Sequence, residues 1–182
     1  MLKMRLRSVV LKTLNIFVII AVLIFITSCS SKKSTINKVS NEHEVLSYIL
    51  KKSNGNIYYK TIIEEGNIPI ESYVKNEYLE FYLCSNGVDS PVKIPKEEVT
   101  FLKQKVKSVS VQRIDKLFPN LKDKTTKKKT RFKTSFISMP ILFRNNTMAI
   151  YYSTQTYGGE FKLLQKVNGE WETICANSVW IE

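Results

Sequence analysis

The stretch that decides the fold is residues 147–181, TMAIYYSTQTYGGEFKLLQKVNGEWETICANSVWI. It holds three runs of apolar and β-branched residues, which are separated by Tyr157-Gly158-Gly159 and by Asn168-Gly169. Asn-Gly between two such runs is the strongest short signal for a β-hairpin, because both central residues of its turn need positive φ. We therefore expect three antiparallel strands, over 147–156, 160–167 and 170–181.

Three further strands are expected upstream of this meander. Residues 131–137 form a fourth C-terminal run, separated from the next by Asn145-Asn146. Residues 56–64 and 77–85 predict an N-terminal pair of strands, since both are rich in β-branched and aromatic residues.

Two short amphipathic helices complete the predicted fold. A capping pattern with Asn41 as N-cap opens the first, over 42–53, where apolar residues recur at helical spacing. Proline suits the first turn of a helix, so the second is expected to open at Pro95. The whole pattern predicts an α+β domain in which one face of the meander packs under both helices.

The N-terminus has the features of an export signal. Residues 1–12 carry four basic and no acidic residues, and residues 14–26 are almost entirely apolar. A membrane-spanning helix needs about 20 apolar residues. Lys12 and Thr27 limit this run to fewer, so a retained transmembrane anchor is the weaker interpretation.

The end of this segment, Ile26-Thr27-Ser28-Cys29, resembles the lipobox of bacterial lipoproteins. The resemblance implies cleavage before Cys29 and acylation of its sulfur, and hence a lipid-anchored protein of the bacterial cell membrane that faces the periplasm or the cell surface. Ser30 and Ser31 are not an acidic retention signal, which favours the outer membrane. The alternative is an ordinary signal peptide with a chance cysteine. The expected organisation is a signal peptide over 1–28, a lipidated tether over 29–40 and one domain over 41–182.

The C-terminal region also resembles small uncharacterised bacterial lipoproteins. The resemblance covers at most 136–182 and rests on Met139-Pro140-Ile141-Leu142-Phe143, the alternating residues 149–153, the glycine pair, and the Asn-Gly-Glu-Trp of 168–171. No activity is attached to that pattern, so it implies none here.

The basic residues are concentrated in one segment. The chain carries a net charge of +12, and removal of the four basic residues of 1–28 leaves +8. Residues 103–133 hold 12 basic and two acidic residues, a charge of +10, so the remainder of the mature chain is −2. Such a segment could contact an anionic lipid, a glycan or an acidic protein. We do not expect nucleic acid as a partner of an exported protein.

A weak binding site is predicted within this segment, at Lys124, Lys127, Lys128, Lys129 and Arg131. Its alternative is a solvated loop, which is what charge runs commonly are. The many strand tyrosines could bind glycans or peptides through their rings and hydroxyls, but ordinary half-buried strand positions explain them as well.

Cys84 and Cys175 are the two remaining cysteines. An oxidising compartment permits a disulfide between them. Both lie in apolar, strand-like segments, so two buried free thiols are the alternative.

The sequence offers little material for catalysis. His43 is the single histidine and fits a helix cap, and neither a metal site nor a cofactor is expected. Glu64, Glu65, Glu71 and Glu80 could supply the paired carboxylates of an envelope-polymer hydrolase, but solvated surface is their default interpretation. A binding or structural role is therefore preferred to an enzyme, and an inhibitor or immunity-type lipoprotein is a further alternative.

Overall fold

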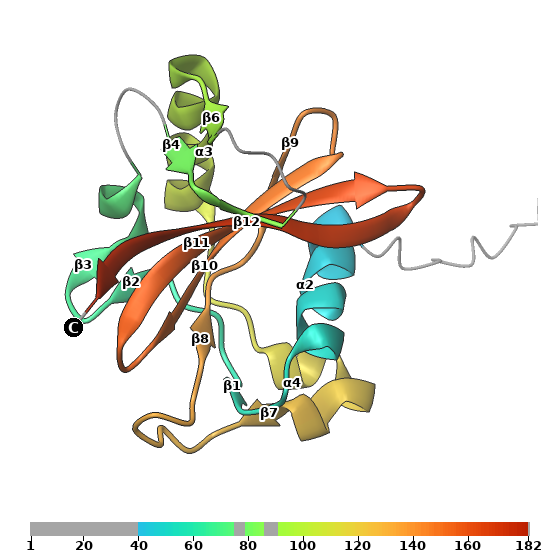
Figure 1. The fold of residues 1–182 in the computed structure, drawn as a ribbon. Helices are drawn as coiled ribbons and strands as arrows, with labels where there is room; N and C mark the ends of the chain where they lie inside the picture. Colours follow the sequence, from blue (N-terminus) through green and yellow to red (C-terminus); the bar gives the residue numbers. More distant parts are fainter. Residues whose placement is uncertain (1–39, 75–78, 86–90, 182) are drawn as a thin grey trace, which may run out of the picture. The chain divides into compact units, whose positions relative to one another are not determined.

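The C-terminal meander is present as the sequence predicts. The computed structural model describes residues 40–74, 79–85 and 91–181 (Figure 1). Its longest strands are β10 (Met148–Gln155), β11 (Gly158–Val167) and β12 (Glu170–Ile181), which pair antiparallel in that order. Asn168 and Gly169 have φ of 51° and 87°, so the turn between β11 and β12 has the positive φ values that Asn-Gly favours.

Shorter strands extend this sheet on both sides. The strand order is β5 (Leu83–Cys84), β12, β11, β10, β8 (Phe136–Ile137), and β9 (Ile141–Phe143) also pairs with β10. All these pairings are antiparallel, and the α+β class is confirmed. The predicted strand over 131–137 is mostly loop, since only its last two residues pair with β10.

The helices lie on opposite faces of the sheet, which corrects the prediction that both cover one face. These helices are α2 (Asn41–Lys52), α3 (Lys96–Ser108) and the single turn α4 (Ile114–Leu117). In β10, Ile150 and Tyr152 pack into the apolar cluster that includes α3, whereas Ala149 and Tyr151 pack into the cluster that includes α2 and α4. Because successive strand residues point to opposite faces, a strand that is apolar at every position needs cover on both sides.

The upstream strands are shorter and change partners. β1 (Ile57–Tyr58) pairs parallel with β7 (Thr125–Thr126), and β2 (Glu64–Glu65) forms a hairpin with β3 (Ile68–Pro69). The remaining elements are β4 (Leu79–Phe81), β6 (Val92–Ile94) and two 3-10 helices, η1 (Ile70–Tyr73) and η2 (Pro119–Lys124).

The predicted strand over 77–85 is divided at Tyr82. Its first part, β4, pairs with β6, and its second part, β5, pairs with β12. Phe81 is buried, but Leu83 is 67% exposed, so the expected alternation of apolar residues on one face ends at the change of partner.

The helix ends follow the local chemistry closely. The N-cap of α2 is Ser40 rather than the predicted Asn41, and its side chain accepts a hydrogen bond from the backbone N–H of His43. A serine oxygen at this position satisfies a backbone donor that the first turn leaves free. α3 begins directly after Pro95, and its residues Val99 and Leu102 are buried against the sheet.

Candidate binding loop and adjacent cleft

The predicted lipidation site, Cys29, lies outside the described residues, as do the signal peptide and most of the tether. Within the part of the chain that the structure describes, no helix is long and apolar enough to cross a membrane.

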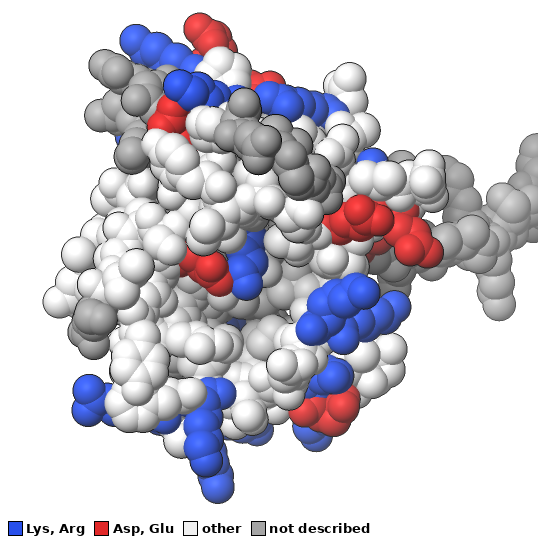
Figure 2. Space-filling model, viewed as in Figure 1, with Lys and Arg blue, Asp and Glu red and all other residues white. Residues whose placement is uncertain are grey.

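The basic segment 103–133 does not form one surface. Lys103, Lys105 and Lys107 lie on α3, on one side of the sheet, whereas the basic residues from 113 onward lie around α4, η2 and the loop before β8. Figure 2 shows basic surface at both the upper and the lower end of the view. The sheet lies between these two groups, so basic residues that are close in the sequence are far apart on the surface.

The second group is centred on an exposed loop, 127–133, which we call the basic loop. Lys127, Lys128, Lys129, Arg131 and Lys133 are all exposed there. Thr134, which is buried, fixes the shape of the loop: its hydroxyl donates to the Lys128 carbonyl at 2.9 Å and accepts from the Thr130 N–H at 2.9 Å. The loop therefore presents its cations from a hydrogen-bonded frame.

An exposed aromatic pair stands beside these cations. The rings of Phe132 and Tyr157 stack with centroids 4.7 Å apart, and their exposed fractions are 48% and 61%. The Phe132 N–H donates to the hydroxyl oxygen of Thr156 at 2.8 Å, and the Arg131 guanidinium lies 4.9 Å from the Phe132 ring centroid. The sequence prediction missed Phe132 and counted Tyr157 only among the strand tyrosines; the Arg-Phe-Lys triplet of 131–133 was the available signal.

The predicted binding residues differ in what their side chains contact. Lys124 is half-buried and donates to the Ser53 carbonyl at 3.2 Å, so it stabilises the end of α2. Lys129 lies over the rings of Tyr58 and Phe136, at 5.2 and 6.0 Å from their centroids. Of the five predicted binding residues, this leaves Lys127, Lys128 and Arg131 as the ones whose charges the loop presents to solvent.

The acidic residue nearest to this group is already paired. Arg113 holds Asp115 by two hydrogen bonds of 3.1 and 2.6 Å. These bonds lower the pKa of the Asp115 carboxyl, against a smaller opposing effect of burial. Asp115 is therefore charged at neutral pH and is compensated mainly by Arg113.

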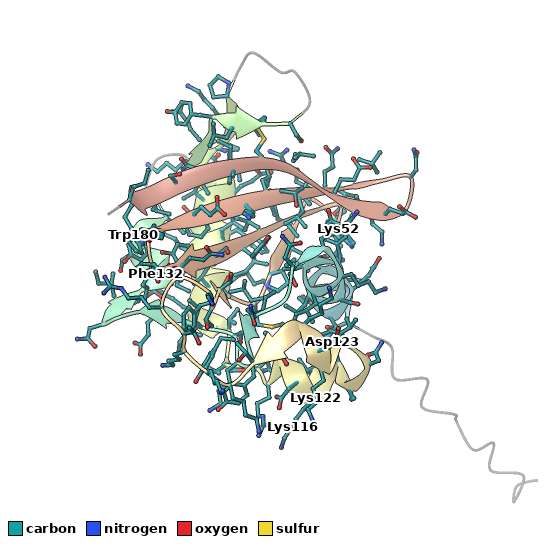
Figure 3. All side chains as sticks on the ribbon, turned by 60° about the horizontal axis from the view of Figure 1, so that its bottom comes forward. Lys52, Lys116, Lys122, Asp123, Phe132 and Trp180 are labelled. Carbon is teal, nitrogen blue, oxygen red and sulfur yellow. A yellow bond between two sulfur atoms is a disulfide. The ribbon has the colours of Figure 1, made fainter. Side chains whose placement is uncertain are left out.

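A cleft of about 710 Å³ adjoins the basic loop. The cleft is bounded by the C-terminal end of α2 and by residues 53–57 and 133–137, which hydrogen-bond to each other at Asn56 and Ser135. Its floor is the α2 face of the sheet. Figure 2 shows the surface hollowed near the centre of the view. In Figure 3, Trp180 and Lys52, which both line the cleft, lie well apart along it.

Polar side chains dominate this cleft. Ser153 and Gln155 of β10 and Ser178 of β12 contribute hydroxyl and amide groups. Lys52, Lys133 and Lys162 bring three positive charges. Among the described lining residues Glu160 is the one carboxylate, and Lys162 pairs with it at 2.8 Å.

Tyr151 is the most buried aromatic residue of the lining, with an exposed fraction of 7%. Burial, reinforced by the nearby Glu160 and Tyr48, raises the pKa of its hydroxyl. The hydroxyl therefore stays protonated and can donate a hydrogen bond into the cleft.

On the α3 face of the sheet, polar side chains hydrogen-bond to one another. The Glu65 carboxylate of β2 accepts hydrogen bonds from the hydroxyls of Tyr152 and Thr154 and, at 2.8 Å, from Trp180 Nε1. A Cβ atom on Gly159 would overlap the Tyr152 hydroxyl and Trp180 Nε1, so only glycine leaves room for this cluster. We call these four residues, Glu65, Tyr152, Thr154 and Trp180, the Glu65 cluster.

Two of the four candidate carboxylates thus have structural partners. Glu65 was expected at a solvated surface but anchors the β2–β3 hairpin to the sheet, and Glu80 is buried and paired with Lys93 at 2.7 Å. Neither lines the cleft. Trp180 is half-buried and hydrogen-bonded in the Glu65 cluster.

Cys84 and Cys175 form a disulfide that joins β5 to β12. The two residues are direct cross-strand partners, and both sulfurs belong to the apolar cluster on the α3 side. The bridge therefore fixes the edge of the sheet farthest from the basic loop in strand order.

No family model, no curated protein and no solved structure matches this chain. Functional inference consequently rests on its own residues and their arrangement.

Proposed function

We propose that the chain is a lipid-anchored protein of a bacterial envelope with a binding role, and that its basic loop contacts an anionic membrane surface. The observation that carries the proposal is the loop itself, which holds five exposed cations together with Phe132, whose ring stacks on Tyr157. Export and anchoring rest on the basic, apolar and lipobox pattern that ends at Cys29.

The loop has the chemistry of a membrane-interface contact. Each lysine or arginine close to an anionic bilayer contributes about 1 kcal/mol, and this attraction falls off within a Debye length. Aromatic rings with one exposed edge are enriched at the level of the lipid headgroups. Cations and rings on one hydrogen-bonded loop can therefore engage the same surface together.

A lipid anchor makes such a weak contact effective. A single acyl chain holds a protein marginally, and stable attachment needs a second signal such as further acyl chains or a basic patch. Twelve residues separate Cys29 from Asn41, which spans at most about 40 Å when extended. The tether would keep the basic loop close to the bilayer at a high effective concentration.

The hydrolase alternative has less support. An acid/base pair needs two carboxylates flanking a bound substrate. In the described lining of the cleft, Glu160 stands as a single carboxylate already paired with Lys162.

Anchoring is tested by replacing Cys29 with Ala. Incorporation of labelled fatty acid into the full chain should disappear, because the sulfur that accepts the lipid is gone. Cys84→Ala is the matched control, since it also removes a thiol but lies in the disulfide. Unchanged labelling of Cys29→Ala would contradict the anchoring proposal.

The membrane contact is tested with a reporter on the basic loop of the mature chain. With Cys84 and Cys175 bridged and Cys29 lipidated, Thr130→Cys supplies a single free thiol for an environment-sensitive dye. We expect a blue shift in vesicles that contain anionic lipid and none in zwitterionic vesicles, with the response lost at high salt.

The chain provides a matched charge control for this experiment. Replacing Lys127, Lys128 and Lys129 by Gln should abolish the blue shift, whereas the same change at Lys103, Lys105 and Lys107 of α3 should not. Equal loss from both triple variants would show that only the total charge matters, and would contradict a specific contact by the loop.

A further inference from the structure

We propose that the cleft between α2 and the sheet is a binding site for an anionic sugar chain, one that carries carboxylate or phosphate groups. This site goes beyond the membrane contact proposed for the basic loop, and the two share Lys133 and Tyr157 at their border. The volume of about 710 Å³ lies inside the range of about 300–1,000 Å³ that small-ligand sites occupy.

The lining favours a ligand with many hydroxyl groups over an apolar one. Ligand pockets are mostly lined by apolar side chains with a few polar groups. In this cleft polar side chains outnumber apolar ones. Hydroxyl and amide groups come from both the floor and the walls, and they include Asn54, Asn56, Ser135, Gln155 and Thr173. Polar groups that a bound ligand would cover favour a ligand that can hydrogen-bond to them, which a hydroxylated chain does and a lipid tail does not.

Aromatic faces are available for the sugar rings. Tyr157 lies at one end of the lining, and Tyr48 and Tyr151 lie nearer to α2. Tyrosine combines an apolar face with a polar group, so it can pack on the C–H face of a sugar and hydrogen-bond its hydroxyls.

The charges of the cleft favour an anion. Lys52 and Lys133 are exposed at the border of the cleft, and Lys162 stands on the floor with Glu160 as its ion-pair partner. Three cations against one paired carboxylate leave a positive potential, and the neighbouring cations of the basic loop add to it. Lysine binds carboxylate and phosphate as a point charge, so the site does not require one geometry of the anion.

The backbone around the cleft argues against an extended peptide as the ligand. Peptides commonly add a strand to an unpaired sheet edge. The floor consists of β10, β11 and β12, which pair with one another along most of their length. On the wall, the Ser135 carbonyl accepts from the Tyr58 N–H at 2.8 Å, and the Ser135 N–H donates to the Asn56 carbonyl at 3.0 Å.

The test measures binding to the mature, lipidated chain in a non-ionic detergent, by calorimetry or NMR titration. The probes are an oligosaccharide of four uronic acids, a neutral tetrasaccharide, inorganic phosphate alone and an acidic peptide of similar charge. We expect the uronic-acid oligosaccharide to bind at least tenfold more tightly than each of the others. Equal binding of the neutral sugar would overturn the role of charge, and tighter binding of the peptide would overturn the sugar assignment. Phosphate alone binding as tightly would indicate an anion site without sugar recognition.

Two variants of the same ion pair should shift the affinity in opposite directions. Lys162→Gln should weaken binding of the acidic oligosaccharide about tenfold, because it removes a cation and leaves Glu160 to repel the ligand. Glu160→Gln should instead tighten it several-fold. If the ion pair had only a structural role, both variants would bind the oligosaccharide more weakly, and that result would count against the site.

Lys128→Gln separates this proposal from the membrane contact. Lys128 belongs to the basic loop but does not line the cleft, so its loss should reduce the vesicle response and leave the oligosaccharide affinity within twofold. Tyr151→Phe should have the reverse pattern, with weaker binding of the oligosaccharide and an unchanged vesicle response. If neither the wild type nor Glu160→Gln binds the acidic oligosaccharide at millimolar concentration, the cleft is not a sugar site, whatever the vesicle assay shows.

Discussion

Strand β10 carries polar side chains on both faces of the sheet, and the two faces differ in whether another segment covers those side chains. On the α3 side, Tyr152 and Thr154 of β10 are capped by the Glu65 carboxylate. On the α2 side, their neighbours Tyr151 and Ser153 line an open cleft. The side chains of β10 alternate between the two faces and so place polar groups on both. Only on the α3 side does another segment, the β2–β3 hairpin, supply a hydrogen-bond partner for them.

The difference teaches that a polar strand position becomes a candidate site only when the fold leaves it without a partner. The β2–β3 hairpin brings one carboxylate to three donors and closes its side. No equivalent hairpin covers the α2 side among the described residues, since the chain after α2 turns away at 53–57 to form a wall.

The largest effect should come from the disulfide, which belongs to the closed side. Replacing Cys84 and Cys175 together by Ala should lower the free energy of unfolding by about 4 kcal/mol, because the bridge closes a long loop. The two residues are 91 apart in the sequence. Denaturant unfolding measures the change, and oligosaccharide binding at low denaturant should persist. A loss below about 1 kcal/mol would show that the α3 side does not depend on this bridge.

A side chain at Gly159 should open the closed side from within. Gly159→Val should cost about 1–3 kcal/mol or more, because its Cβ would displace Tyr152 and Trp180 from Glu65. Thermal unfolding measures the loss. Ser153→Val is the control on the open side, where the neighbouring space should keep its effect small.

Removing the Glu65 carboxylate should have a slightly smaller effect. Glu65→Ala removes the acceptor of the Tyr152 hydroxyl and one of the acceptors of Thr154 and Trp180, which costs about 1–3 kcal/mol. Glu64→Ala is a matched control, because Glu64 is the exposed neighbour in the same strand. Similar unfolding midpoints for both variants would mean that the Glu65 cluster adds no stability.

High pH should act on the two faces alike. Burial raises the pKa of both Tyr151 and Tyr152 above the ordinary value, and the hydrogen bond to Glu65 adds to the shift at Tyr152. The neutral form is favoured in the folded state, so this contribution is complete below about pH 10 and is lost as the pH rises further.

Each of these tyrosines should remove about 1.4 kcal/mol of stability per pH unit above pH 10. Tyr151→Phe and Tyr152→Phe should each make the alkaline loss shallower when unfolding is measured between pH 8 and 11. An unchanged slope in one variant would show that its hydroxyl already ionises in the folded protein.

The fold was predictable where local signals determine it. Asn168-Gly169 specifies its turn by φ alone, and the periodicity of 147–181 specifies three strands. The placement of the helices on two faces could not be predicted from the sequence. Ala149 and Tyr151 look like ordinary strand residues, and only their burial shows that the second face is covered. Where 77–85 changes partner depends on β6 and β12, which lie distant in the sequence.

The candidate site was predictable in part. The charge of the basic loop is evident from the sequence, but its separation from α3 requires the topology. Phe132 and Tyr157 are 25 residues apart, and nothing local pairs them. The cleft combines residues from 48 to 181, so its lining could not be assembled from neighbouring positions.

The position of β12 has a consequence for biosynthesis. This strand is the last of the described strands to be made, yet it lies inside the sheet between β5 and β11. Until it emerges from the ribosome, β5 lacks its neighbour and the thiol of Cys84 has no native partner. The chain has three cysteines, so an early thiol could be oxidised by the wrong one. A lipid on the Cys29 sulfur would remove that error before it arises, because it leaves Cys84 a single choice within its own chain.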